Sequence, residues 1–215
     1  MAAQPASVTM PPALPGFEHI NRYWDKLQGR YAAKILPGQF YVTLNDEAIV
    51  TVLGSCVAAC IRDRVFGVGG MNHFMLPDDG RNSERLLQPG SLATRYGNHA
   101  MEQLINAILK AGGRRENLEV KIFGGGQIIR NMRTLDIGRR NIDFVHEYIR
   151  TEGLVLAAED TGDIYPRKVM YFPASGVARV KRLRHMHNDT IVRRELDYRE
   201  ELVQQPAAGE VELFD

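Results

Sequence analysis

The chain has 215 residues, of which 44% are hydrophobic and 25% are charged, a composition typical of a globular protein with one sizeable core. Its 27 Lys and Arg side chains nearly balance 26 Asp and Glu side chains, and a net charge of +1 indicates neither nucleic acid nor an anionic membrane as a partner. No apolar run approaches the length of a membrane span and no secretory signal pattern opens the chain, so we expect no membrane insertion and a cytoplasmic location.

Two segments are predicted ahead of the main domain. Residues 1–16 are rich in Ala and Pro, which predicts a flexible arm. Residues 17–33 carry apolar side chains at helical spacing, so we expect an amphipathic helix that packs on the protein's own core, with the groove of a partner as the alternative. The side chains that set this spacing are Phe17, Ile20, Trp24, Leu27 and Tyr31.

Three apolar runs between residues 48 and 77 predict an antiparallel meander. Residues 48–53 form the first run, a buried strand that the Gly54-Ser55 turn interrupts. The second run begins at Cys56, and the third follows a Gly-rich bend and contains His73. We therefore expect a thiol at a strand end and an imidazole on a neighbouring strand, within reach of each other.

A thiol beside an imidazole is suited to nucleophilic catalysis. A free thiol has a pKa of about 8.5, and an adjacent imidazolium lowers that pKa and yields a standing thiolate. We predict Cys56 as the nucleophile and His73 as the base. The backbone amides of the turn, at Gly54 and Ser55, are predicted to stabilise an oxyanion.

An imidazole in this role needs a third group to orient it. Thr51, on the strand before the turn, is one candidate through its hydroxyl. Asn72 is the other, although as the neighbour of His73 on a strand it should point to the opposite face.

The same residues allow a purely structural interpretation. A lone Cys in an apolar run is usually a small buried hydrophobe, and Cys60 is interpreted in this way. On one extended strand, the Cα atoms of Cys56 and Cys60 would lie about 13 Å apart, beyond the reach of a disulfide bond. No zinc-ligand spacing accompanies them, so we expect neither a disulfide nor a metal or cofactor site.

The remaining chain predicts alternating helices and strands. Residues 78–90 suggest a polar loop that either rims the site or only connects two elements. Residues 184–205 are highly charged, which predicts a solvated helix, and the final GEVELFD predicts a disordered tail, with docking on a partner as the alternative. The other expected elements are strands over 40–44, 118–123 and 154–158, helices over 91–111 and 139–151, a turn over 159–162, and a hairpin of 168–172 with 177–183.

Several short motifs follow one another along the chain. The most specific are GSCVAAC over 54–60 and GGMNHFMLP over 69–77. The others are KILPG over 34–38, KIFGGG over 121–126, IGRRN over 137–141 and AEDTG over 158–162, the last followed by Asp163 where a second Gly is common. Together they resemble the CheD family, the chemoreceptor glutamine deamidases of bacterial chemotaxis.

The resemblance implies a fold and a division of the chain. The fold would be α+β, with packed, sandwich-like β-sheets flanked by helices, similar to the cytotoxic necrotising factor deamidases. Residues 34–183 would form the deamidase domain, after the arm and the amphipathic extension, and 184–215 would be a charged C-terminal extension and tail. The family's catalytic residues match Cys56, His73 and Thr51.

The activity that the resemblance implies is that of a protein-glutamine glutaminase. It would hydrolyse glutamine side-chain amides of methyl-accepting chemoreceptors without a cofactor, with glutamyl methylesterase activity as a side reaction. A CheC-like phosphatase is the further partner that the family suggests. The alternative is a non-catalytic module that binds such a phosphatase or the receptors, and fast alkylation of Cys56 below neutral pH would favour the enzyme.

Overall fold

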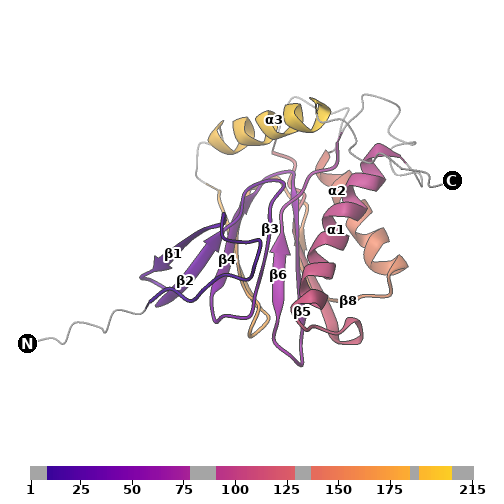
Figure 1. The fold of residues 1–215 in the computed structure, drawn as a ribbon. Coiled ribbons are helices and arrows are strands. Elements are labelled where there is room, and N and C mark those ends of the chain that lie inside the picture. The colour runs from indigo at the N-terminus through magenta and orange to yellow at the C-terminus, as the bar shows by residue number, and fades with distance from the viewer. Residues whose placement is uncertain (1–8, 78–90, 129–136, 185–188, 205–215) are drawn as a thin grey trace, which may run out of the picture.

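The structure is a computed structural model that describes residues 9–77, 91–128, 137–184 and 189–204. Within these ranges the chain forms ten β-strands in two five-stranded sheets, and three α-helices. Figure 1 shows helices α1 and α2 on one side of the strands and α3 lying across one end of them. This is the predicted α+β arrangement, whereas the likeness to the cytotoxic necrotising factor fold stays a prediction.

The first sheet combines strands from both halves of the chain. In spatial order they are β1 (Asn21–Asp25), β2 (Arg30–Lys34), β4 (Ala48–Leu53), β9 (Arg167–Phe172) and β10 (Val177–Arg182). Neighbours pair antiparallel except β2 and β4, which run parallel. The central strand β4 is buried at nearly every residue, which explains its almost continuous apolar sequence.

The second sheet contains the remaining strands. In spatial order they are β3 (Phe40–Thr43), β6 (Gly69–Asn72), β5 (Val57–Asp63), β7 (Leu118–Gly124) and β8 (Val155–Thr161). The predicted meander is wrong in one respect, because β5 pairs with β6 and β7 whereas β4 belongs to the first sheet. The Gly54-Ser55 interruption is therefore a crossing between two layers and not a hairpin turn.

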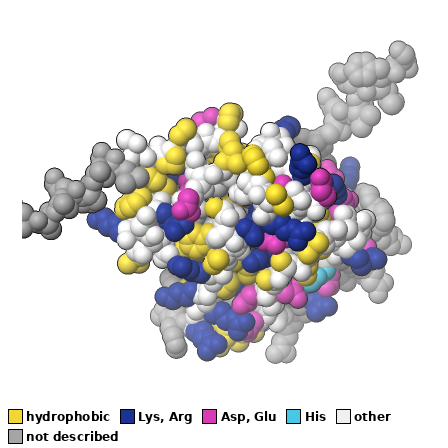
Figure 2. Space-filling view, turned by 90° about the horizontal axis from the view of Figure 1, so that it is seen from below, with side chains coloured by type: hydrophobic (Ala, Val, Ile, Leu, Met, Phe, Trp, Pro, Cys, Tyr) yellow, Lys and Arg dark blue, Asp and Glu magenta, His cyan; other side chains and the backbone are white. Residues whose placement is uncertain are grey.

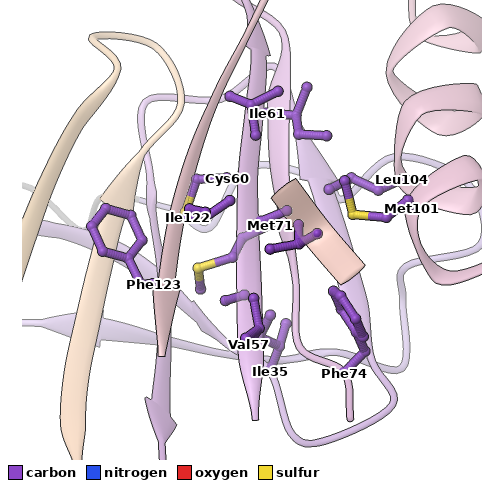
Figure 3. Close-up of a cluster of buried hydrophobic side chains, with 14 of the residues drawn as sticks. Ile35, Val57, Cys60, Ile61, Met71, Phe74, Met101, Leu104, Ile122 and Phe123 are labelled. Carbon is purple, nitrogen blue, oxygen red and sulfur yellow. The ribbon is translucent and has the colours of Figure 1, made fainter. Parts of the chain in front are cut away.

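Helices α1 (Leu92–Lys110) and α2 (Ile137–Thr151) pack on the second sheet. The Ser91 side chain caps α1 by accepting the Thr94 N–H at 3.1 Å, which fixes the predicted start of the helix. Figure 3 shows Met101 and Leu104 of α1 beside side chains of the second sheet, and both are fully buried. These contacts join the sheets and helices into one main hydrophobic core.

The predicted N-terminal helix is wrong, because β1 and β2 form a hairpin there. Asp25 Oδ1 accepts the backbone N–H groups of Leu27 and Gln28 at 2.9 and 3.1 Å, which makes a tight turn. Leu27, counted in the helical stripe, is 94% exposed in that turn. Trp24 and Tyr31 are cross-strand partners with rings in edge contact, so pairing overrides the helical spacing.

The other strands and helices predicted between residues 40 and 183 are confirmed, with one partial exception. Residues 159–161 continue β8 in parallel pairing with β7, and the expected turn follows only at Gly162 and Asp163, which have φ of 73° and 66°. The buried Arg167 guanidinium pairs with Asp160 and fixes the end of this strand. The predicted loop over 78–90 and the tail over 209–215 lie outside the described residues.

The surface agrees with the balanced charge of the sequence. Figure 2, viewed from the side opposite α3, shows basic and acidic side chains interspersed among hydrophobic ones. Among the described helices, none is both long and apolar enough to cross a membrane.

Candidate active site

Cys56 and His73 lie at the end of the second sheet, where β5 begins and β6 has just ended. The residues that follow them, Val57 and Phe74, exchange two backbone hydrogen bonds of 2.9 Å. Because side chains alternate along paired antiparallel strands, Cys56 and His73 are diagonal neighbours on one face, a relation with a typical spacing of roughly 7–8 Å. Both are buried, so the predicted thiol and imidazole share one enclosed region.

Thr51 contacts the His73 ring and fixes its tautomer. The Thr51 hydroxyl lies 2.7 Å from His73 Nδ1 and donates its only proton to the Ile35 carbonyl oxygen at 2.9 Å. Its oxygen must then accept from Nδ1, so Nδ1 carries the ring proton and Nε2 keeps its lone pair. Nε2 is buried and has no hydrogen-bond partner among the described residues. This is the form that an imidazole base takes.

Asn72, the alternative orienting residue, faces away from the ring. Its Oδ1 accepts the Ala59 N–H at 2.8 Å, and its Nδ2 donates to the Ala100 carbonyl oxygen at 3.1 Å. These bonds join β6 to β5 and to α1. Asn72 therefore has a structural role, on the face that the strand alternation predicts.

The turn at residues 54–56, here called the cradle, is held from behind through its three carbonyl oxygens. The N–H groups of Gly126 and Gly125 donate to the first and third carbonyls at 2.6 and 2.7 Å. Asn141 Nδ2 donates to the second at 2.8 Å. A Cβ at Gly124 would lie 2.2 Å from the Cys56 carbonyl oxygen, so the Gly-rich end of β7 permits this close backbone approach.

The three N–H groups of the cradle converge on the opposite side, on the carboxylate of Glu195. They donate to it at 2.9 Å from Gly54, 2.9 Å from Ser55 and 3.3 Å from Cys56. The Ser55 hydroxyl adds a fourth hydrogen bond of 2.6 Å. Successive backbone N–H groups that converge in this way form an anion-binding site.

Glu195 belongs to α3 (Asp189–Gln204), and the sequence analysis missed it. The prediction of a helix in this charged stretch is correct, but the prediction that it is solvated fails for one face, where Glu195 is 3% exposed and Leu202 is 5% exposed. A signal was present in the sequence. Ile191, Glu195, Tyr198 and Leu202 recur at the spacing of one helix face, which places a carboxylate inside an apolar stripe.

Burial and the nearby charges set the protonation states in the site. Burial, and then the charge and hydrogen bonding of Glu195, raise the pKa of the Cys56 thiol well above its usual value. Burial, and then the Arg194 guanidinium, lower the pKa of His73 to about 3. With α3 in place the site contains a neutral thiol and a neutral imidazole. Burial first, and the Glu195 carboxylate second, disfavour the expected thiolate in this arrangement.

Asn141, on α2, is a second residue whose position was not predicted. It is fully buried, and besides the bond to the cradle its Oδ1 accepts the Leu76 N–H at 2.9 Å. It thereby ties the cradle to the segment that follows His73. The IGRRN motif contained Asn141, but nothing in the local sequence indicated the two backbone groups that it binds.

A pocket of about 210 Å³ lies beside His73, between the second sheet and α1. Tyr96 of α1 lines it, and the Tyr96 hydroxyl is hydrogen-bonded to that of Tyr198 on α3. Across the described ranges, no cluster of three or more His, Cys, Asp or Glu side chains is arranged to hold a metal ion.

A cysteine-dependent amide hydrolase needs a thiol, an imidazole in the right tautomer with a lone pair that no other group binds, and converging backbone donors, and within the described residues this α+β scaffold brings these together. Comparison with known sequences narrows this class. The family model described as CheD chemotactic sensory transduction matches residues 75–182. The chain belongs to the CheD family, which confirms the resemblance seen in its motifs.

Three relatives illustrate the similarity, each named probable chemoreceptor glutamine deamidase CheD. The chain is 59% identical over 208 residues to that of Halorhodospira halophila, which covers 96% of this chain and 95% of the relative. It is 55% identical over 199 residues to that of Herminiimonas arsenicoxydans, covering 92% and 97%. It is 50% identical over 212 residues to that of Saccharophagus degradans, covering 97% and 96%. The similarity therefore includes α3 as well as the two sheets.

Proposed function

We propose that this chain is a protein-glutamine glutaminase that deamidates methyl-accepting chemoreceptors in the cytoplasm during chemotactic adaptation. The names of its relatives support the activity and the substrate. The observation that carries the proposal is the cradle, whose N–H groups bind the carboxylate of a glutamate side chain next to the Cys56 thiol. A glutamate side chain is the product of glutamine deamidation.

In the first half of the reaction, Cys56 becomes acylated. His73 Nε2 takes the thiol proton, and the sulfur attacks the carboxamide carbon of the substrate glutamine. The cradle N–H groups stabilise the oxyanion of the tetrahedral intermediate. The proton on Nε2 then passes to the leaving nitrogen, so that ammonia departs and a thioester remains. Thr51 holds Nδ1 throughout, which keeps Nε2 directed at the reacting groups.

In the second half, water releases the product. His73 Nε2 takes a proton from the water, whose oxygen attacks the thioester carbon, and the same cradle binds the second oxyanion. The carbon–sulfur bond then breaks, the proton returns to the sulfur, and a glutamate side chain is left on the receptor. A glutamyl methyl ester would react in the same way with methanol as the leaving group, so we propose methylesterase activity as a side reaction.

The direct test is mass spectrometry of a receptor cytoplasmic fragment incubated with the protein. We expect glutamine-to-glutamate conversion at particular sites with the unmodified chain, and none with Cys56→Ala or His73→Ala, each checked for folding by circular dichroism. Full conversion by either variant would contradict the mechanism. Binding to a CheC-like phosphatase is a separate proposal, which pull-down with such a phosphatase would test.

A further inference from the structure

Helix α3 occupies the site through one side chain. Glu195 accepts hydrogen bonds from all three cradle N–H groups and from the Ser55 hydroxyl. It is nevertheless 139 to 141 residues away from these groups in the sequence. No local constraint places it there, so its position reflects the docking of the whole helix.

The cradle is shaped to admit this carboxylate closely. A Cβ at position 54 would lie 2.7 Å from Glu195 Oε1 and 2.3 Å from Ile128 Cδ1, so a larger residue would have to displace both side chains. A carboxylate in such a position receives charge-assisted hydrogen bonds, which are stronger than neutral ones. The arrangement is that of a bound ligand and not of a loose surface contact.

Further residues of α3 fasten it over the same edge of the protein. Tyr198 lies over Gly38, where an added Cβ would be 2.9 Å from its hydroxyl oxygen, and it is hydrogen-bonded to Tyr96. Leu202 is buried and belongs to the main core. One face of a helix thus spans the site, with the carboxylate between apolar and aromatic contacts.

We propose that α3 is an intramolecular product mimic, which occupies the groove where a helix of the substrate receptor docks and presents Glu195 where the converted glutamine would lie. This inference rests on the proposed function for the identity of the substrate. It assigns the receptor-binding surface to the groove beneath α3, with Gly38 and Tyr96 as contacts beyond the cradle. The receptor helix must displace α3 before its glutamine reaches Cys56.

The docked helix also keeps the nucleophile protonated. Burial is the main factor opposing ionisation of the Cys56 thiol and protonation of His73, and the Glu195 carboxylate and the Arg194 guanidinium add to it in turn. Both effects disfavour the thiolate–imidazolium pair. Release of α3 would remove both charges at once, so displacement and activation are one event.

The first test measures how fast iodoacetamide modifies each cysteine, by mass spectrometry of the two cysteine peptides. We expect Glu195→Ala to accelerate modification of Cys56 by about tenfold or more, because charge-assisted contacts are lost, while Cys60 stays protected. Leu202→Ala keeps Glu195 but loosens the helix, and should give a smaller acceleration. The exposed Glu200→Ala serves as the matched control, with the rate of the unmodified chain. Equal Cys56 rates in all four proteins would overturn the proposal.

The second test uses the chain as its own substrate. In Glu195→Gln the carboxamide should lie on the cradle, and Cys56 should convert it back to glutamate, with the small mass gain of deamidation, at a rate that does not change on dilution. Glu200→Gln should keep its glutamine, and so should Glu195→Gln combined with Cys56→Ala. The new carboxamide of Glu195→Gln is compared with that of a receptor fragment. If the same protein deamidates the fragment but leaves its own carboxamide intact, residue 195 does not lie where the substrate glutamine reacts, and the proposal is overturned.

The two tests separate this inference from the proposed function. Faster Cys56 modification in Glu195→Ala, with no receptor deamidation by any variant, would support α3 as an occupant of the site and contradict the receptor as substrate. Receptor deamidation that is equally fast in the unmodified chain, Glu195→Ala and Leu202→Ala would support the function and overturn the inhibitory role of α3.

Discussion

The two cysteines of this chain occupy regions that look alike by burial and differ in what covers them. Cys56 and Cys60 are free, nearly inaccessible and four residues apart, and burial raises the pKa of both thiols well above the usual value. Cys60 lies in the middle of β5, paired with Met71 on one side and Lys121 on the other. Cys56 directly precedes β5, where its backbone N–H donates to Glu195 of α3.

Burial alone therefore does not distinguish a core thiol from a candidate nucleophile. Uncovering Cys60 would require the sheets to come apart, which is global unfolding. Departure of α3 from the cradle beside Cys56 would be a local opening, which costs much less free energy than global unfolding.

The largest effect should come from replacing each cysteine by alanine. Cys56→Ala should reduce receptor deamidation to background, because no other thiol lies at the cradle. Cys60→Ala should keep most of the activity and lower the free energy of unfolding by on the order of 1 kcal/mol through a small cavity. Deamidation assays and urea unfolding check both. Loss of activity in a well-folded Cys60→Ala would contradict the purely structural role of Cys60.

Removal of the Thr51 hydroxyl should give the next largest effect. Thr51→Val keeps the shape but leaves Nδ1 of His73 without its acceptor, so we expect kcat to fall by roughly tenfold to a hundredfold with KM nearly unchanged. Thr51→Ser retains the hydroxyl and should restore most of the rate. Steady-state kinetics of the three proteins are the measurement. A loss in Thr51→Val as complete as in Cys56→Ala would show that Thr51 does more than orient the ring.

A smaller, more informative effect is expected from the two buried asparagines. Asn141→Ala and Asn72→Ala each leave backbone groups unsatisfied, at a cost of about 1–3 kcal/mol per group in the free energy of unfolding. Both variants should therefore lose stability in urea. Of the two variants, only Asn141→Ala should also slow deamidation, because Asn141 is hydrogen-bonded to the cradle and Asn72 is not. Equal rates in the two variants would mean that the cradle keeps its shape without this contact.

The smallest effect is a dependence of stability on pH. The pKa of His73 is lowered from 6.5 to about 3 in the folded protein, so the unfolded chain binds the proton more readily. The stability that the neutral ring contributes is complete above pH 6.5 and is lost as pH falls from 6.5 toward 3. His73→Asn should lose less stability than the unmodified chain over this range. Urea unfolding at several pH values checks the difference.

Much of the fold could be predicted because it follows from local patterns. The buried run of β4, the Ser91 cap of α1 and the β9–β10 hairpin are all encoded within a few neighbouring residues. The helix expected over 17–33 failed because pairing of β2 with β4, a non-local contact, decided between two conformations that the local sequence allows.

The candidate site was predictable to a different extent at each residue. Cys56, His73 and the Gly54-Ser55 turn lie within one short stretch. Strand alternation argues against Asn72 as the orienting residue, and the family resemblance favours Thr51. Glu195 and Asn141 could not be found in this way, because their partners are 139 to 141 residues and 65 to 86 residues distant in the chain. Each becomes a partner of the cradle only once its helix has docked.

The position of α3 near the end of the described chain affects how the nascent protein folds during synthesis. Every residue of the cradle and its supports precedes α3, and the earlier parts of a chain fold first as the ribosome releases them. Nascent molecules therefore pass through a stage in which the thiol and its backbone donors are assembled before Glu195 has emerged. A ribosome that stalls with α3 still in its exit tunnel would hold a protein whose catalytic groups are complete and whose inhibitor has not yet been released.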